Sequence, residues 1–197
     1  MLHVCNNGVP TEESFTAENS IRVDGLVTDW WIQGTLNTKY YLNTIGCTPP
    51  SGCTRTIGFY KTHAVPNLYG HNQDMVSAYL PIYLGLPAGA KTLVVNSNTQ
   101  VVSIMQFTGP GGASNGILKL YAQLLAAKLN IAGANGSGQG TSNSCIRLTI
   151  IAADAFLATH NANDWATMSK VQRALVLGAM TILDKYNNGL LCVSHCD

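Results

Sequence analysis

The pattern of apolar and polar positions changes near residue 50, and its two sides predict different structures. Between residues 21 and 42 the apolar positions are mostly β-branched or aromatic, which is typical of short strands. Residues 48–52 contain two adjacent prolines and a glycine, so they exclude a helix and mark a boundary. We therefore expect a β-rich N-terminal segment over residues 1–50 and a helical domain over residues 53–197. The fold class is mainly α, of the α+β kind.

Apolar residues recur at helical spacing in three later segments. The segment 115–132 is apolar around so much of its surface that we expect it at the centre of the domain. Two more helices are predicted over 144–159 and 169–186, and the second should end at the turn residues 187–189.

Other segments carry weaker patterns. Residues 1–20 are polar and contain turn signals, so we expect them to be poorly ordered except where Cys5 anchors them. A helix is predicted from Met75 toward Gly85, although Pro81 should kink or end it. Propensity alone predicts a hairpin from residues 92–95 and 100–107. Residues 133–144, rich in Gly, Ser and Asn, predict a flexible linker.

Candidate binding residues are concentrated in residues 53–63. This segment combines a cysteine, the aromatics Phe59 and Tyr60, and the basic residues Lys61 and His63. The aromatic and basic side chains could form a recognition surface, or they could begin a core element whose polar atoms are hydrogen-bonded. The sequence leaves both interpretations open.

The same segment resembles the Cys-Thr-x-Thr-x-Gly-Tyr-Trp-Lys-x-His opening of a module found in secreted and surface-attached bacterial proteins. That module has no established activity. The resemblance covers residues 53–196 and continues, in order, through segments 124–132, 152–154 and 183–189 and the closing His195-Cys196. The chain departs from the family pattern at Phe59-Tyr60 and lacks the Pro and Trp that often follow the His. The resemblance implies a very short hairpin followed by a helix from about Gln100.

Composition narrows the classes of partner. Charged residues make up 11% of the chain, against an average of about 25% for globular proteins. A net charge of +1 predicts no broad attraction to nucleic acid or to anionic membranes. The longest apolar run, residues 150–157, is interrupted by Asp154 and is shorter than the roughly 18 to 20 residues of a membrane span.

Six cysteines, an even number without a Cys-x-x-Cys pair, favour three disulfides over a zinc site. Disulfides persist in oxidising compartments, so we expect an extracellular or cell-surface location. The alternative is six buried thiols in a cytoplasmic protein. From their positions along the chain we expect the pairs Cys5 with Cys47, Cys53 with Cys196, and Cys145 with Cys192.

Asp154 is a carboxylate among apolar helical neighbours and therefore needs a polar partner. Arg147, two turns earlier on the same helix, could pair with it through an intermediate group. Tyr60, Lys61 or His63 could also supply the donor. We interpret Asp154 as a structural hydrogen-bonding residue, with a general acid or base as the alternative.

The sequence shows no cofactor or metal signature. His63, His71 and His195 with Asp74 could converge on a metal, but their spacing matches no ligand motif. The glycine-rich segments 109–112 and 133–140 lack the strand and Gly-Lys-Ser/Thr context of phosphate-binding loops.

Two functional hypotheses remain. The first is a non-enzymatic surface, assembly or binding module whose partners are other surface proteins, copies of itself or a glycan. Trp30 and Trp31, on opposite faces of a predicted strand, add one candidate contact for such a partner. The second is a glycan- or peptidoglycan-active hydrolase that uses Asp154 or Asp74 with His63, which would require two carboxylates about 5 to 9.5 Å apart in a cleft.

Overall fold

The computed structural model describes residues 2–6, 9–13, 52–137 and 139–196. Contacts divide the chain into two units, residues 1–50 and 51–197, and each is described by itself. Three predictions fall on residues outside the described ranges. They are the strands within residues 21–42, the candidate contacts Trp30 and Trp31, and the pair of Cys5 with Cys47, of which Cys47 is not described.

The described part of the first unit is an antiparallel strand pair. β1 (Leu2–Asn6) pairs with β2 (Val9–Glu13), and Leu2 lies opposite Glu13. The sequence pattern predicts turns and no strands at these positions, so this strand pair is a difference from the prediction. An Asn-Gly dipeptide at positions 7 and 8 is the strongest short-range hairpin signal, and it separates the two strands in the sequence.

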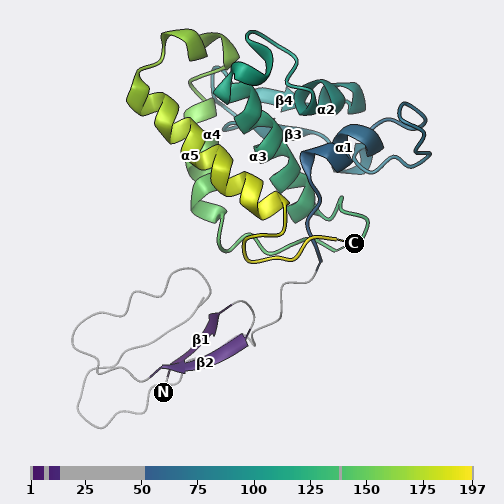
Figure 1. Ribbon diagram of the computed structural model, residues 1–197, viewed down its shortest axis with the longest axis vertical. Coiled ribbons are helices and arrows are strands. Elements are labelled where there is room, and N and C mark those ends of the chain that lie inside the picture. The colour runs from purple at the N-terminus through teal and green to yellow at the C-terminus, as the bar shows by residue number, and fades with distance from the viewer. Residues whose placement is uncertain (1, 7–8, 14–51, 138, 197) are drawn as a thin grey trace. The chain divides into compact units, whose positions relative to one another are not determined.

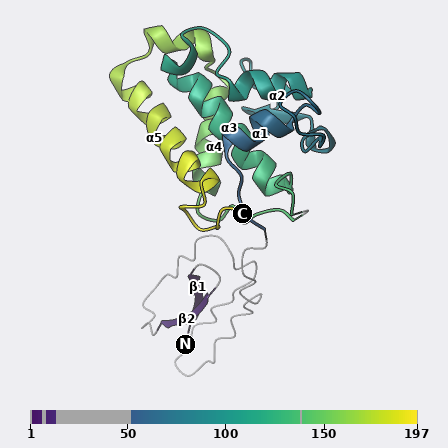
Figure 2. The ribbon, with the colours of Figure 1, turned by 45° about the vertical axis from the view of Figure 1, so that its right-hand side comes forward.

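Helix α3 (Gly116–Ala132) forms the centre of the second unit, as its wide apolar surface predicts. α5 (Lys170–Asn187) packs along it, and α4 (Arg147–Leu157) contacts both of these helices. α1 (Ile57–His63) and α2 (Asn98–Met105) pack together and against α3 on the side away from α5 (Figures 1 and 2). About half of the described residues are helical, so the unit is mainly α. Within the described part of the chain, every helix is too short or too polar to cross a membrane.

The two longest helices begin and end close to their predicted bounds. The side chain of Asn115 accepts hydrogen bonds from the backbone N–H groups of Ile117 and Leu118 at the start of α3. Ser169 and Gln172 form a capping box at the start of α5. After α5, Gly189 adopts a φ of 69°, a left-handed conformation that glycine adopts at little cost.

A small hairpin lies where part of a helix is predicted. β3 (Ile82–Leu84) pairs antiparallel with β4 (Leu93–Val95). The helix expected from Met75 toward Gly85 is limited to one short 3-10 turn because Pro81 cannot continue it. Beyond Pro81, Ile82 and Leu84 are buried and the residue between them is exposed, which is strand periodicity.

The segment 100–107 belongs to α2 and a turn, so the hairpin that propensity predicts for it is wrong and the helix implied by the resemblance is confirmed. Ser97 and Gln100 form the capping box of this helix. Three 3-10 helices complete the unit: η1 (Ser77–Tyr79), η2 (Gly112–Ser114) and η3 (Ala162–Thr167).

The two predicted disulfides whose cysteines both lie in the described residues are present. Cys53 pairs with Cys196, and Cys145 pairs with Cys192. The first joins the two ends of the unit, where Thr54 and His195 also form an isolated parallel bridge. The two pairs are compatible with an extracellular protein.

Residues 133–144 are predicted to be a flexible linker, but their described part packs against the domain. Ala134, Asn135 and Thr141 are buried. The Asn135 side-chain amide donates to the carbonyl oxygen of Cys53 at 2.7 Å. The glycine- and serine-rich segment is therefore a tight, hydrogen-bonded loop and not a flexible linker.

Candidate functional site

Tyr60 is the only completely buried residue of α1, and its hydroxyl donates a 2.8 Å hydrogen bond to Asn130 Oδ1 on α3. The helix begins at Thr56, whose side chain caps it, and this places Tyr60 against α3. Burial raises the pKa of the Tyr60 phenol, so the group stays neutral and cannot act as a base near neutral pH. Of the two interpretations of residues 53–63, Tyr60 fits the core element.

Asn130 makes four hydrogen bonds, and three of them hold this segment in place. Its Oδ1 accepts from the Tyr60 hydroxyl and from the backbone N–H of Arg55 at 2.8 Å. Its Nδ2 donates to the Arg55 carbonyl at 2.9 Å and to Asn187 Oδ1 at 3.1 Å. Asn187 in turn donates to the side chain and backbone of Gln123. Asn130 and Asn187 are completely buried, and the network joins α1, α3 and α5.

The other aromatic residue of α1 is part of a surface stack. The Arg55 guanidinium carbon lies 4.7 Å from the centre of the Phe59 ring, and the His63 ring stacks on Phe59 with centres 4.1 Å apart. His71 continues the stack, with its ring centre 3.9 Å from that of His63. Phe59 and His63 are partly buried. Much of the Phe59 ring is therefore engaged within the unit.

The predicted meeting of Asp154 with Tyr60, Lys61 or His63 is wrong. Tyr60 bonds Asn130 instead, and His63 Nδ1 lies 2.9 Å from the Phe59 carbonyl oxygen one helical turn earlier. Lys61 is partly exposed and makes no hydrogen bond or ion pair with other described residues. Tyr60 therefore has its partner on α3 and His63 has its partner within α1.

Asp154 has a different partner, Lys128 on α3. The Lys128 ammonium lies 2.7 Å from both carboxylate oxygens of Asp154, and the two side chains are 19% and 14% exposed. The carboxylate also accepts from the backbone N–H of Gly85 at 2.9 Å, and the ammonium donates to the Tyr83 carbonyl. This ion pair joins α3, α4 and the end of β3. Arg147, which could pair with Asp154 through an intermediate group, is exposed at the first position of α4, and the carboxylate of Asp154 bonds Lys128 and Gly85.

Asp74 is a turn-forming residue rather than part of a cluster. Its Oδ1 accepts from the backbone N–H groups of Val76 and Ser77, and its Oδ2 accepts from Asn98. Burial raises the pKa of the Asp74 carboxyl, but these hydrogen bonds outweigh burial and leave it below its usual value. Among the described residues, neither Asp74 nor His63 forms a hydrogen bond or ion pair with Asp154. The hydrolase hypothesis, which uses Asp154 or Asp74 with His63, stays a prediction.

His71 and His195 are not part of a cluster of acidic or thiol ligands among the described residues. His71 and His195 are exposed, and His195 lies at the bridge beside the Cys53 to Cys196 disulfide. Within the described ranges, no group of three or more His, Cys, Asp or Glu side chains could hold a metal ion.

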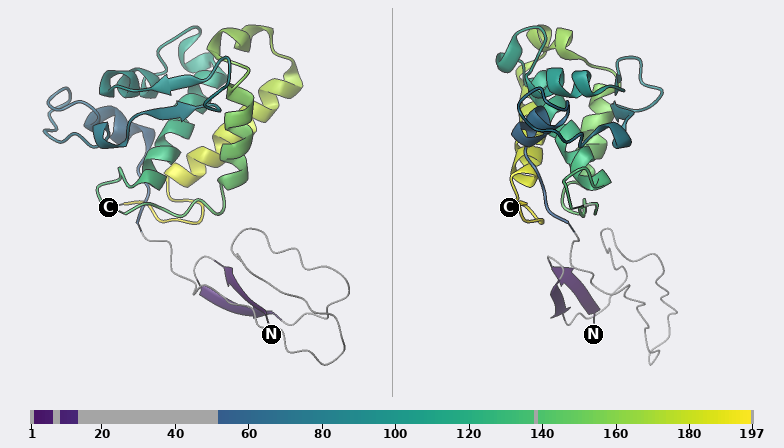
Figure 3. Two further views of the ribbon diagram at one scale, coloured as in Figure 1. Left: turned by 180° about the vertical axis from the view of Figure 1, so that it is seen from behind. Right: turned by 90° about the vertical axis from the view of Figure 1, so that its right-hand side faces the viewer.

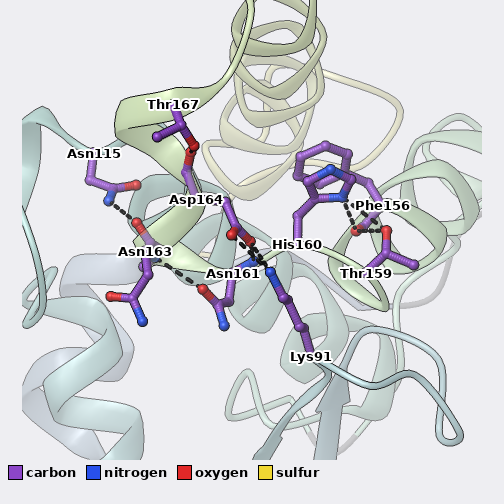
Figure 4. A network of polar contacts seen from close by, with 10 residues as sticks. Lys91, Asn115, Phe156, Thr159, His160, Asn161, Asn163, Asp164 and Thr167 are labelled. Atoms are coloured by element: carbon purple, nitrogen blue, oxygen red, sulfur yellow. Dashed lines mark hydrogen bonds and ion pairs between the residues drawn. The ribbon is translucent and has the colours of Figure 1, made fainter.

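A second polar network lies at the other end of α3 (Figure 4). The Lys91 ammonium lies 2.8 Å from both oxygens of Asp164, which also accepts from the backbone N–H of Asn161. The ion pair with Lys91 is the main cause that lowers the pKa of the Asp164 carboxyl. Nearby, His160 stacks on Phe156 one turn before it. The network fixes η3 to the loop that precedes β4, a structural role that sequence analysis missed.

Exposed aliphatic side chains follow one side of α5 and continue onto α4. Val171, Leu175, Gly178 and Ile182 are spaced by four, three and four residues, which puts them on one side of α5. The large exposed members of the surface are Leu148, Ile151, Val171, Leu175 and Ile182, which are 72%, 54%, 70%, 68% and 39% exposed. Small exposed residues lie between them: Ala152, Ala155, Ala174 and Gly178. We call these nine residues the α4–α5 face.

The two helices that carry these residues contact each other directly (Figure 3). Tyr186 follows Ile182 by one helical turn, and its hydroxyl donates to the carbonyl oxygen of Ser142, shortly before α4 begins. The end of α5 therefore lies beside the start of α4. Sequence analysis missed this face because helical periodicity alone does not tell a buried stripe from an exposed one.

Comparison of the chain with family models, with curated proteins and with solved structures gives no match.

Proposed function

We propose that the protein is an extracytoplasmic, non-enzymatic module that binds another protein or assembles with it through the α4–α5 face. The exposure of this face carries the proposal. Leu148, Val171 and Leu175 each leave about 70% of their surface open to water, although they lie on helices that pack into the core. A contiguous apolar patch on a soluble protein marks an interaction site more often than a scattered exposed leucine does.

The state of the acidic side chains supports a non-enzymatic role. The four aspartates within residues 52–196 all accept hydrogen bonds inside the unit. Asp154 and Asp164 are also ion-paired. These carboxylates stabilise loops and helix contacts, and a general acid or base would need access to a substrate.

The surroundings of Phe59 favour a protein partner over a glycan. Sugar rings stack on open aromatic faces, but Phe59 already contacts Arg55 and His63. The α4–α5 face carries no aromatic side chain, and its aliphatic and small residues suit packing against another polypeptide. The two disulfides are compatible with a location outside the cytoplasm, and the resemblance to secreted and surface-attached modules agrees with it.

Site-specific photo-crosslinking in the cells that produce the protein tests the proposal. A photoreactive residue replaces Leu175 in the full chain, and a matched variant carries it at Leu68, an exposed leucine in the loop after α1. We expect a defined crosslinked protein from position 175 and none from position 68. Equal crosslinking at both positions, or none at 175, would contradict the proposal.

A further inference from the structure

Gly178 stands in the middle of the exposed side of α5, and the unit itself gives no reason for it. A glycine weakens a helix interior relative to alanine. Its backbone conformation is one that other residues adopt, and a Cβ atom added there would meet no atom within 4 Å. Neither strain nor crowding within the unit excludes a side chain at this position. A second backbone that approaches the helix closely from outside does exclude one.

We propose that the occupant of the α4–α5 face is a second copy of this chain, in a two-fold dimer whose α5 helices cross at Gly178. This inference rests on the proposed function and names its partner. In a two-fold contact the same patch serves both copies, so it must be complementary to itself. Leu175 lies three residues before Gly178 and Ile182 four residues after it. Each helix can therefore insert these side chains beside the glycine of the other.

Charge favours a steep crossing. α5 carries Lys170 at its start and Lys185 near its end, and both are exposed. A nearly antiparallel pair centred on Gly178 would bring Lys170 of one copy close to Lys185 of the other at both ends of the contact. Helices that cross at about 50° touch only near the crossing point and separate toward their ends. The crossing at Gly178 thus keeps the lysines apart and in water.

The exposed area predicts a weak dimer. The exposed fractions of the five large residues of the α4–α5 face add up to about three complete aliphatic side chains. This corresponds to roughly 200 to 350 Å² of apolar surface per copy. A standard interface buries about 800 Å² per partner, a little over half of it apolar. The large residues alone supply roughly half to three quarters of that apolar area, so the contact is smaller than a standard interface. Self-association should therefore depend on concentration in the micromolar range or above.

Analytical ultracentrifugation of the purified, oxidised full chain tests the dimer over a wide range of concentration. The deciding variant is Gly178→Leu, which adds apolar surface to the face and improves helix propensity. If the helices cross closely at Gly178, this variant raises the dissociation constant about tenfold or more, as for loss of a central contact. Nonspecific hydrophobic association would instead become stronger, and that result would overturn the proposal.

Two further variants separate folding from association. Leu175→Asp should abolish the dimer, and Leu68→Asp, the same change at an exposed leucine outside the face, should leave it unchanged. The melting temperatures of all variants confirm that they fold. A loss of association in Leu68→Asp equal to that in Leu175→Asp would contradict the assignment of the interface.

The dependence of binding on salt concentration distinguishes the possible partners of the α4–α5 face. Raising salt from about 0.05 M to about 0.5 M should not weaken the dimer, because its contact is apolar and the lysines stay apart in water. An acidic partner or an anionic membrane would bind more weakly at the higher salt. Binding of monomers to phosphatidylglycerol vesicles, lost at high salt, would overturn the dimer in favour of a lipid surface. A chain that stays monomeric yet crosslinks from position 175 to a different protein overturns the dimer and leaves the proposed function intact.

Discussion

Asn130 is a neutral side chain that uses both donors and its acceptor oxygen at a completely buried position. We expect Asn130→Ala to lower the free energy of unfolding by about 3 to 5 kcal/mol, because it leaves the Tyr60 hydroxyl and two backbone groups of Arg55 without their partner. Denaturant titration measures the loss. Asn163→Ala is the matched control, since that side chain is exposed, and it should change stability by less than about 0.5 kcal/mol.

The Lys128 to Asp154 ion pair allows a different test, in which the second substitution repairs the first. Asp154→Ala should cost about 2 to 3 kcal/mol, because the Lys128 ammonium and the Gly85 N–H lose a partner in a mostly buried place. Partial exposure of both side chains keeps the cost below that of a fully buried pair. The double variant Lys128→Met with Asp154→Leu should recover most of the loss. Equal losses in the single and double variants would show that the two residues do not act as a pair.

The need of Asp154 for a partner could be predicted from its apolar neighbours, but the identity of the partner could not. Lys128 lies in an equally apolar segment, so the sequence contains the same need with the opposite charge. What brings the two together is the packing of α4 against α3, and periodicity does not define how helices pair. Asn130 was missed for a related reason: a neutral amide in an apolar helix gives a weaker signal than a charge.

At the scale of elements, Asn115 connects the start of α3 to the preceding loop and to η3. Its Oδ1 caps the helix, while its Nδ2 donates to the carbonyl oxygens of Pro110 and Ala162. Asn115→Ala should therefore cost about 2 kcal/mol, the upper end of the range for a cap. Ser169→Ala, which removes the exposed cap of α5, should cost about 1 kcal/mol. Thermal and denaturant unfolding of both variants compares them, and a larger loss for Ser169→Ala would contradict this account.

Long helices were predicted more reliably than short elements, and α3 and β3 show why. α3 has many turns of apolar residues and a capping asparagine, so several independent signals agree over its length. β3 has three residues, and its pairing with β4 depends on a partner strand that lies eight residues further along the chain. The alternating burial of β3 arises only when the hairpin packs against α3. It therefore depends on the tertiary structure and could not be predicted from the sequence.

At the scale of the whole molecule, buried tyrosines predict how stability responds to alkaline pH. Burial raises the pKa of Tyr121 to about 12, and it also raises the pKa of Tyr60 and of Tyr186. In the unfolded chain these groups titrate near pH 10. Their contribution to stability is thus complete below about pH 10 and is lost as the pH rises above it, by about 1.4 kcal/mol per pH unit for each tyrosine.

Unfolding free energies measured between about pH 9 and about pH 11.5 test this expectation. Tyr121→Phe is the sharpest comparison, because it removes one titrating group and should make the alkaline slope shallower by one tyrosine's share. An unchanged slope in this variant would mean that the Tyr121 phenol ionises as readily in the folded protein as in the unfolded chain.

The disulfide between Cys53 and Cys196 places the two ends of the second unit side by side, with their Cα atoms 4.8 Å apart. The Thr54 to His195 bridge beside this disulfide is parallel, so the chain runs in the same direction where it enters the unit and where it leaves it. The short distance between the two ends allows a brief connecting loop to join them. A unit with this geometry can be grafted into a surface loop of a host protein without forcing the two sides of that loop apart, and its own chain can be circularly permuted.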